Sequence, residues 1–262
     1  MYIILNIIIY AIKINMKIKN TIGYEELNPN NIKIKCSIII PVYNNYNFTK
    51  SCLKDLSKLS YEYEVIVVDN GSDDNTVNLE KLPKADLPCR FKLIKSGFNE
   101  GFARACGRGY QASQGEYILF LNNDIRVQKN YEIWIEDLLI GAEDDSLVGP
   151  TAGLLDKNLN FIKEMSRLES GNCYMSGWCL CAKKEVFDKL VLEGCQGPFT
   201  YETFCYFEDT DLSFRAKELN ITFKIVPVPV VHFGQTTSKR LGLNKLYTQA
   251  KAIFVKKWIN RI

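Results

Sequence analysis

Histidine is almost absent from this sequence, with one residue in 262, at position 232. The nine cysteines have no regular spacing and are odd in number. Their closest group, Cys173, Cys179 and Cys181, lacks a second CxxC pair. These shortages disfavour both a structural zinc site and a disulfide framework. We expect free thiols buried in the core of a protein from a reducing compartment, the cytoplasm.

Long apolar runs and strong net charge are lacking too. The stretch Met1–Ile12 is apolar apart from Asn6, but it is shorter than the roughly 20 residues that span a bilayer. It has neither a basic start nor an A-x-A cleavage site, so the sequence gives little support for a signal peptide. We therefore assign residues 1–34 to a leader or extension of unknown role, and a peripheral membrane contact stays open. A net charge of +3 gives no reason to expect a nucleic-acid partner.

Two phosphate-binding fingerprints are missing as well. Gly97, Gly101, Gly107 and Gly109 do not form G-x-G-x-x-G, which disfavours a dehydrogenase. No Gly-rich loop containing lysine follows the first expected strand, which disfavours a nucleotidyltransferase. Internal repeats and low-complexity linkers are also absent, so residues 35–262 are expected to form one domain.

Buried strands and helices alternate through the first half of the chain. The run 35–42 is β-branched and unbroken by polar residues, as is typical of a strand covered on both faces. Further strands are expected at 64–69, 91–94 and 117–121, and helices at 48–59, from Asp73 or Asp74, and at 101–112. This alternation predicts an α/β fold with a mostly parallel sheet. Beyond it we expect helices at 131–140, 183–190 and 212–218, a hairpin around 156–161 and a final amphipathic helix.

Three polar groups directly follow these apolar strands: Pro41-Val42-Tyr43-Asn44, Asp69-Asn70-Gly71-Ser72 and Asn122-Asn123-Asp124. The carboxyl ends of parallel strands meet in one crevice, where ligands bind. Each group alone is equally typical of a turn. Together they predict a shared binding site.

In this order and spacing, the motifs resemble the family 2 glycosyltransferases of the GT-A fold. The matching segments are CSIIIPVYNN, VIVVDNGSDDNT, NEGFARA, EYILFLNND, MSGW and YFEDTDLSFRAKELN, followed by His232 and the helix around Trp258. The similarity covers about residues 35 to 260 and points to a rhamnosyltransferase-like branch of inverting enzymes. It implies a single Rossmann-like sheet, with a nucleotide-sugar-binding half at 35–125 and an acceptor-binding half at 126–262.

The resemblance also assigns the nucleotide of a UDP-, GDP- or dTDP-linked sugar to particular residues. Pro41, Tyr43 and Asn44 lie near the base, and Asp69 contacts the base or ribose. An aromatic edge and a carboxylate acceptor suit a uracil-like ring. The donor-side loop adds Asn99, Gly101 and Arg104, although Arg104 on a solvated helix face is an equally open interpretation.

A divalent cation, Mn²⁺ or Mg²⁺, is implied by the same resemblance. Such an ion neutralises a departing diphosphate when carboxylate holds it in a polar crevice. Asp124 is the first expected ligand and His232 completes the shell, with Asn122 and Asn123 nearby on the donor. The family often has an acid where this chain has Asn122. Outside the family context, a lone histidine is more often structural.

The acceptor hydroxyl needs a general base, and Glu208-Asp209 supplies two carboxyl groups. The resemblance indicates Asp209 as base, with Glu208 orienting the acceptor. Alternatively, Asp209 caps the helix 212–218. Trp178 offers a platform for a sugar ring or packs in the core. The basic segment 235–240 is suited to close over the diphosphate.

The sequence thus predicts a hexosyl- or deoxyhexosyltransferase that acts on a glycan or other hydroxyl acceptor. Two alternatives stay open: a nucleotidyltransferase, and a non-catalytic module that binds sugar nucleotides or glycans. The final helix is expected to pack on the domain or to lie on an anionic membrane. The sequence favours no particular oligomeric state.

Overall fold

The structure, a computed structural model, describes residues 33–128, 134–234 and 244–261. Contacts divide the chain into Met1–Lys33 and Ile34–Ile262, and the elements below all belong to the second unit. Most of the leader expected at 1–34 lies outside the described residues, as do the start of the helix expected at 131–140 and the segment 235–240.

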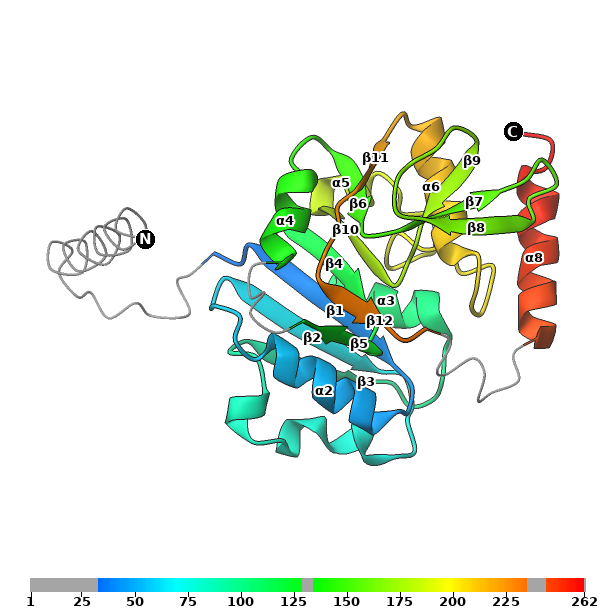
Figure 1. The fold of residues 1–262 in the computed structure, drawn as a ribbon. Coiled ribbons are helices and arrows are strands. Elements are labelled where there is room, and N and C mark those ends of the chain that lie inside the picture. Colours follow the sequence, from blue (N-terminus) through cyan, green and yellow to red (C-terminus); the bar gives the residue numbers. More distant parts are fainter. Residues whose placement is uncertain (1–32, 129–133, 235–243, 262) are drawn as a thin grey trace, which may run out of the picture. The chain divides into compact units, whose positions relative to one another are not determined.

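A seven-stranded sheet runs through the second unit in the order β11-β6-β10-β4-β1-β2-β3 (Figure 1). Strand β1 pairs in parallel with both β2 and β4, while β10 runs antiparallel to β4 and β6. The expected α/β fold with a mostly parallel sheet is confirmed. Its strands are β1 (Cys36–Val42), β2 (Tyr63–Asp69), β3 (Phe91–Lys95), β4 (Tyr117–Leu121), β6 (Ser146–Gly149), β10 (Cys179–Lys183) and β11 (Thr222–Ile225).

Both faces of the central strands are covered, which explains why their sequences lack polar alternation. Successive side chains of a strand point to opposite faces. Ile38 and Ile40 pack in one core cluster with helices α2 (Tyr46–Leu56) and α4 (Trp134–Gly141), and Ile39 packs in a second with α3 (Phe102–Gln111). The second cluster also contains residues of α5 (Lys184–Asp188) and α6 (Glu208–Glu218).

The segment after β2 differs from the expected α-helix. It forms two 3-10 segments, η2 (Asn75–Lys81) and η3 (Lys84–Asp86). Asp74 does cap the first of them, accepting a hydrogen bond from Thr76 N at 2.9 Å. Non-helical angles at Asn78 interrupt the turn, and Pro83 cannot continue a helix, so short tight turns replace a regular α-helix.

The second half of the chain adds two small sheets and a long helix. Strands β7 (Ala152–Leu155), β8 (Phe161–Met165) and β9 (Asn172–Met175) form an antiparallel sheet that contains the expected hairpin. A two-stranded ribbon joins β5 (Ile125–Val127) to β12 (Val230–His232). Helix α8 (Asn244–Trp258) buries Ala250, Phe254 and Trp258 against the domain.

A buried ion-pair network ties α8 to α6. Asp211 accepts hydrogen bonds from Arg215 Nε at 2.8 Å and from Trp258 Nε1 at 2.9 Å. Arg215 also donates to the carbonyl oxygens of Leu190 and Pro198. Every buried charge in the network is therefore paired, as the low-dielectric interior requires.

None of the helices that the structure describes is long and apolar enough to cross a membrane. All nine cysteines lie in the described part of the chain and all are free, with Cys173, Cys179 and Cys181 buried. The expectation of buried free thiols is confirmed for that cluster.

Candidate active site

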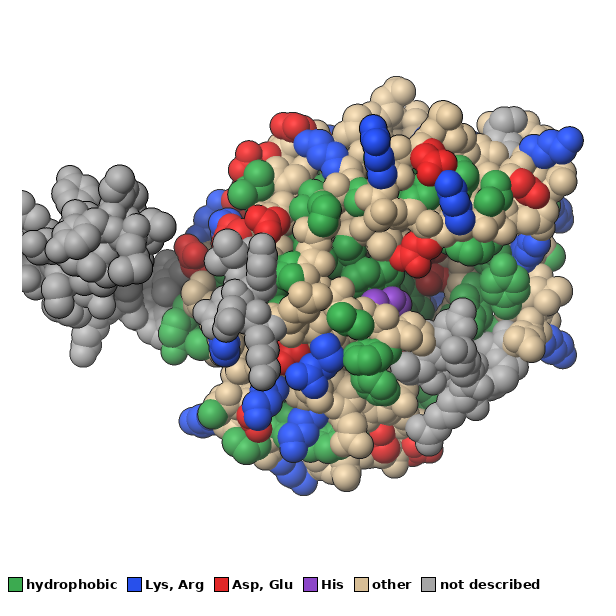
Figure 2. Space-filling view, viewed as in Figure 1, with side chains coloured by type: hydrophobic (Ala, Val, Ile, Leu, Met, Phe, Trp, Pro, Cys, Tyr) green, Lys and Arg blue, Asp and Glu red, His purple; other side chains and the backbone are tan. Residues whose placement is uncertain are grey.

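A cavity of about 460 Å³ opens where the strands β1, β2 and β4 end. Figure 2 shows the histidine side chain in a hollow of the surface, with acidic side chains beside it. Ten of the thirteen site residues expected from the sequence line the cavity. They are Pro41, Tyr43, Asn99, Gly101, Asn122, Asn123, Asp124, Glu208, Asp209 and His232.

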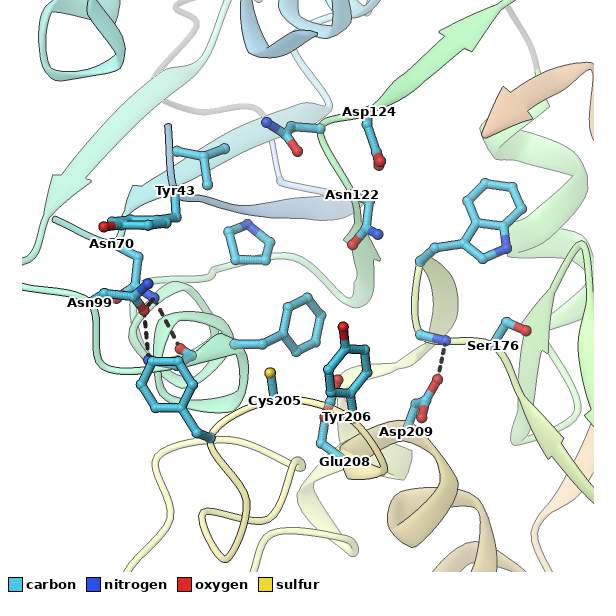
Figure 3. A pocket seen from close by; sticks show the side chains of 18 of the residues that line it. Tyr43, Asn70, Asn99, Asn122, Asp124, Ser176, Cys205, Tyr206, Glu208 and Asp209 are labelled. Atoms are coloured by element: carbon cyan, nitrogen blue, oxygen red, sulfur yellow. Dashed lines mark hydrogen bonds between the residues drawn. The ribbon is translucent and has the colours of Figure 1, made fainter. Parts of the chain in front are cut away.

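Asn70 stabilises one wall of the cavity; the sequence analysis placed it in a polar group at the end of a strand but gave it no role of its own. Its Nδ2 donates to Asn99 Oδ1 at 2.9 Å and to Gly101 O at 3.1 Å (Figure 3), and its Oδ1 accepts from Glu100 N at 3.0 Å. The buried side chain thus joins the end of β2 to the loop 99–101. Its signal in the sequence was its position, immediately after Asp69 at the end of an apolar strand.

Two expected nucleotide contacts, Asn44 and Asp69, lie behind the cavity lining. Asp69 accepts from Ser72 N at 2.9 Å, and Asn44 Oδ1 accepts from Asp73 N at 2.9 Å. Both side chains are almost fully buried. In this structure they shape the turns that follow β1 and β2.

Arg104 is likewise not among the lining residues. It is exposed on α3, and its guanidinium carbon lies 4.3 Å from the centre of the Tyr201 ring. Of the two interpretations that the sequence left open, this position corresponds to the solvated helix face.

The opposite wall brings Asp124 and His232 together. Antiparallel pairing of β5 with β12 sets His232 opposite Ile125, the residue after Asp124. The Nε2 atom of His232 lies 3.1 Å from Asp124 Oδ1 and 3.3 Å from Asn122 Nδ2. The Asn123 amide is directed toward α2, where its Nδ2 donates to Thr49 Oγ1 at 2.8 Å.

Asp124 and His232 fit a divalent cation in their donor chemistry. A carboxylate oxygen and an imidazole nitrogen are both ligands for Mn²⁺, and carboxylate suits Mg²⁺. Both side chains line the cavity, so a cation held by them would be within reach of a ligand in the cavity. Within residues 33–128, 134–234 and 244–261 no third acid, histidine or cysteine joins them in a metal-binding group.

One face of the Trp178 ring is covered by His232. Its ring stacks on the His232 imidazole at 4.6 Å between centroids, with 8° between the planes. Its Nε1 donates to Thr151 Oγ1 at 3.0 Å. Trp178 therefore holds the histidine ring in place from behind, in addition to lining the cavity.

The acid pair opens helix α6. Gly177 N donates to Asp209 Oδ2 at 2.9 Å (Figure 3), and Thr210 N donates to Asp209 Oδ1 at 2.7 Å. The helix begins at Glu208, with Phe207 in the capping position. The expectation that the helix starts near residue 212 with Asp209 as its cap is wrong, because a left-handed turn at Phe207 starts the helix earlier.

Burial dominates the protonation of this pair. It raises the pKa of Glu208 to about 8, with repulsion from Asp209 as the second cause. Burial also raises the pKa of Asp209, and the hydrogen bonds from Gly177 and Thr210 oppose that rise. Two carboxyl groups side by side resist losing both protons, so the pair holds a proton at neutral pH.

Aromatic residues complete the lining beside the acids. The sequence analysis gave none of them a role, although Phe102 and Tyr206 lie in two of the matching segments, because aromatic residues from separate elements have no common spacing. They are Phe102 on α3, Tyr174 on β9, and Phe204 and Tyr206 in the loop before α6.

Comparison of the sequence with known proteins finds similarity to glycosyltransferases. A family model described as "Glycosyl transferase family 2" matches residues 37–184. An uncharacterized glycosyltransferase of Bacillus subtilis, YfnE, is 33% identical over 99 residues, which are 37% of this chain and 25% of that protein. A dolichyl-phosphate beta-glucosyltransferase of Dictyostelium discoideum is 30% identical over 143 residues, 48% of this chain and 42% of that protein. The chain thus spans less than half the length of either relative.

Solved structures match more of the chain. A mannosyltransferase from Pyrobaculum calidifontis in complex with GDP-Man and Mn²⁺ superposes with a TM-score of 0.58 at 15% identity, over 87% of this chain and 66% of that one. GalNAc-T7 with UDP, GalNAc and Mn²⁺ superposes with a TM-score of 0.57 at 16% identity, over 77% of this chain and 44% of that one. At such identities the likeness is one of fold, and the GT-A fold expected from the sequence is confirmed.

Proposed function

Because this chain belongs to the family 2 glycosyltransferases, we propose that it transfers a sugar, with inversion, from a nucleoside-diphosphate sugar to a hydroxyl acceptor. The transferred group is a hexose or deoxyhexose, and the product belongs to glycan or polysaccharide assembly. Residues 35–125 form the donor half and residues 126–262 the acceptor half.

One observation carries this proposal. Asp124 and His232 lie on one side of a single cavity, and Asp209 lies on another (Figure 3). A displacement needs a group that stabilises the leaving diphosphate and a base that activates the incoming hydroxyl. Opposed placement of the two suits an attack from the face opposite the leaving group, which inverts the anomeric carbon.

The nucleotide half of the donor is proposed to lie along the ends of β1 and β2. Tyr43 and Pro41 provide the surface for the base, and the loop 99–101, fixed by Asn70, approaches the ribose and diphosphate. Structural neighbours contain GDP-Man or UDP-GlcNAc, which fits a UDP-, GDP- or dTDP-linked donor.

Asp124 and His232 are proposed to hold Mn²⁺ or Mg²⁺, with Asn122 orienting the imidazole. When bound, the cation supplies positive charge against the diphosphate. The ring of Trp178 restricts rotation of His232, so the two donors keep a fixed separation.

Asp209 is proposed to accept the proton of the acceptor hydroxyl. Its raised pKa makes it a stronger base than an ordinary aspartate, while the hydrogen bonds from Gly177 and Thr210 fix its direction. Glu208, with a pKa of about 8, is mostly protonated at neutral pH and donates a hydrogen bond to an acceptor oxygen. Asp209 is therefore the proposed base, and the protonated Glu208 is the proposed hydrogen-bond donor to the acceptor.

A cytoplasmic location, with contact at a membrane surface, is part of the proposal. Nine free cysteines fit a reducing compartment. Lysines 245, 251 and 256 on α8 provide basic side chains for an anionic surface, since the apolar side of α8 packs inward.

Nucleoside diphosphate release tests the function. The full chain is incubated with Mn²⁺ and a panel of UDP-, GDP- and dTDP-sugars, and binding of each donor is followed in parallel by thermal shift. We expect release from one donor class, abolished by Asp124→Ala and by Asp209→Asn. Full turnover in both variants contradicts the assignment. Donor binding without release, even with acceptors present, identifies a binding module.

A further inference from the structure

The loop that enters α6 has an unusual backbone at its end. Tyr206 and Phe207 are consecutive residues in the left-handed region, with φ of 72° and 64°. Side chains of this size rarely adopt that conformation, because the β-carbon crowds the following carbonyl. Strain of this kind persists only where surrounding contacts impose it, and it concentrates at functional sites.

Helix α8 supplies those contacts. The ring of Tyr247 packs edge-on against Tyr206 at 5.4 Å and also contacts Phe207 at 5.3 Å. Phe254, further along α8, stacks on Phe207 at 5.2 Å. Side chains from separate turns of α8 thus hold the strained pair.

The rest of the loop is fastened at both flanks. Phe102 N donates to Phe204 O at 3.0 Å, which joins the loop to the start of α3. Lys257 on α8 pairs with Glu202 at 3.0 Å and with Asp211 of α6 at 2.8 Å. The loop is therefore held by α3 and α8, and these contacts impose its conformation.

The consequence of this conformation is the placement of Tyr206. Its side chain lies in the cavity on the same side as Glu208 and Asp209 (Figure 3). Glu208 Oε2 is buried and has no hydrogen-bond partner among the described residues, although its side chain lines the cavity. An aromatic face next to carboxyl groups matches a sugar ring, whose C–H face stacks on the aromatic ring while its hydroxyls meet the carboxyl oxygens.

We propose that Tyr206 is a specificity-determining residue that holds the ring of a carbohydrate acceptor beside Asp209, and that Tyr247 is the positioning residue that keeps it there. The acceptor class is therefore a glycan or glycoside with a free hydroxyl. This inference rests on the proposed transferase function and names its second substrate.

Binding of simple glycosides tests the inference separately from catalysis. The full chain with Mn²⁺ and nucleoside diphosphate is mixed with methyl β-glucoside, methyl β-galactoside and methyl N-acetyl-β-glucosaminide. Saturation-transfer NMR detects which glycosides bind, and acceptor and donor KM are then measured with the binding glycoside and the active donor.

Three variants separate the ring from the backbone. Tyr206→Gly removes the ring while glycine keeps the positive φ without strain, and it is expected to weaken glycoside binding about tenfold with donor KM within about twofold. Tyr206→Phe retains the ring and is expected to bind within about threefold of wild type. Tyr247→Ala is expected to raise acceptor KM about three- to fivefold with little change in donor KM. Tyr247 is 39% exposed, so its truncation leaves the core intact.

Phe98→Ala is the matched control, because Phe98 is 69% exposed and is not among the cavity residues. The inference is overturned if no glycoside binds the wild-type protein. It is also overturned if Tyr206→Gly binds glycosides as Phe98→Ala does, or if it raises donor and acceptor KM equally. Failure of the transferase proposal has a different signature: no donor releases nucleoside diphosphate, whatever the glycosides do.

Discussion

The two sides of the cavity are built by different means. On the proposed donor side, hydrogen bonds fix the turns: Asp69 accepts from Ser72 within its own turn, and Asn70 bonds the loop 99–101. On the acceptor side, Tyr206 and Phe207 have left-handed backbones, and the buried Glu208 has a raised pKa. Hydrogen bonds between polar turns therefore hold the first side, both within one turn and between segments about thirty residues apart. A strained backbone and a buried acid pair, held by packing against α8, form the second side.

Asp209→Asn gives the largest expected effect, on the acceptor side. The amide retains the shape of the carboxylate but cannot take a proton, so we expect kcat to fall about 10²- to 10⁴-fold with donor binding preserved. Rates of nucleoside diphosphate release and donor titration by calorimetry measure the two quantities. Glu208→Gln is the matched control and should lose far less kcat. Equal losses in the two variants would show that the pair has no single base.

The dependence of stability on pH tests the buried acid Glu208. The pKa of Glu208 rises from its ordinary 4.5 to about 8 on folding, so the folded state binds more protons than the unfolded state between these values. The contribution of Glu208 to the free energy of unfolding should therefore fall as pH rises from 4.5 to 8, with a slope of at most about 1.4 kcal/mol per pH unit.

Chemical denaturation across that pH range measures the slope. Glu208→Gln should reduce the slope, because the amide does not titrate. An unchanged slope in the variant would assign the pH dependence to other groups.

Gly101→Ala probes the junction between the two sides. Gly101 has a φ of 89°, and a β-carbon there would lie under 3.0 Å from Phe204 O in the acceptor loop. We expect a loss of about 1–3 kcal/mol in the free energy of unfolding. Gly97→Ala is the control, since a β-carbon at Gly97 would have no neighbouring atom within 4 Å. Urea denaturation compares the stability of the two variants. Equal stability would mean that the backbone at Phe204 moves to accommodate the β-carbon without loss of stability.

Arg104→Gln has the smallest expected effect. The guanidinium is exposed and stacks on Tyr201, a contact of about 0.5–1 kcal/mol at such a site. We expect donor KM to stay within about twofold of wild type. A tenfold rise would instead favour the donor contact of Arg104, the other interpretation that the sequence left open.

The donor side was the more predictable from sequence, and the reason is physical. Parallel strands that are buried on both faces leave an unbroken apolar run, so β1, β2 and β4 and the polar residues after them stand out. The 3-10 segments after β2 were missed because helix type depends on the kink at Asn78, which leaves no periodic signal.

The acceptor side carries little local signal. Tyr206 is one of fourteen tyrosines, and the residue types next to it in the sequence do not predict a positive φ. Its position depends on Tyr247, which lies forty-one residues away on α8. Asp209 was selected only through a family resemblance, and its hydrogen bond with Gly177 joins segments that periodicity cannot relate.

The ribbon of β5 and β12 also sets an order of assembly. Asp124 and His232 are 108 positions apart in the chain, yet they face each other across this ribbon. At translation rates of roughly 5–20 residues per second, the histidine leaves the ribosome roughly 5–20 s after the aspartate. During that interval a nascent chain has β1, β2 and β4 but only one of the two proposed cation ligands. The proposed cation site therefore forms only after both strands of the ribbon have been synthesised.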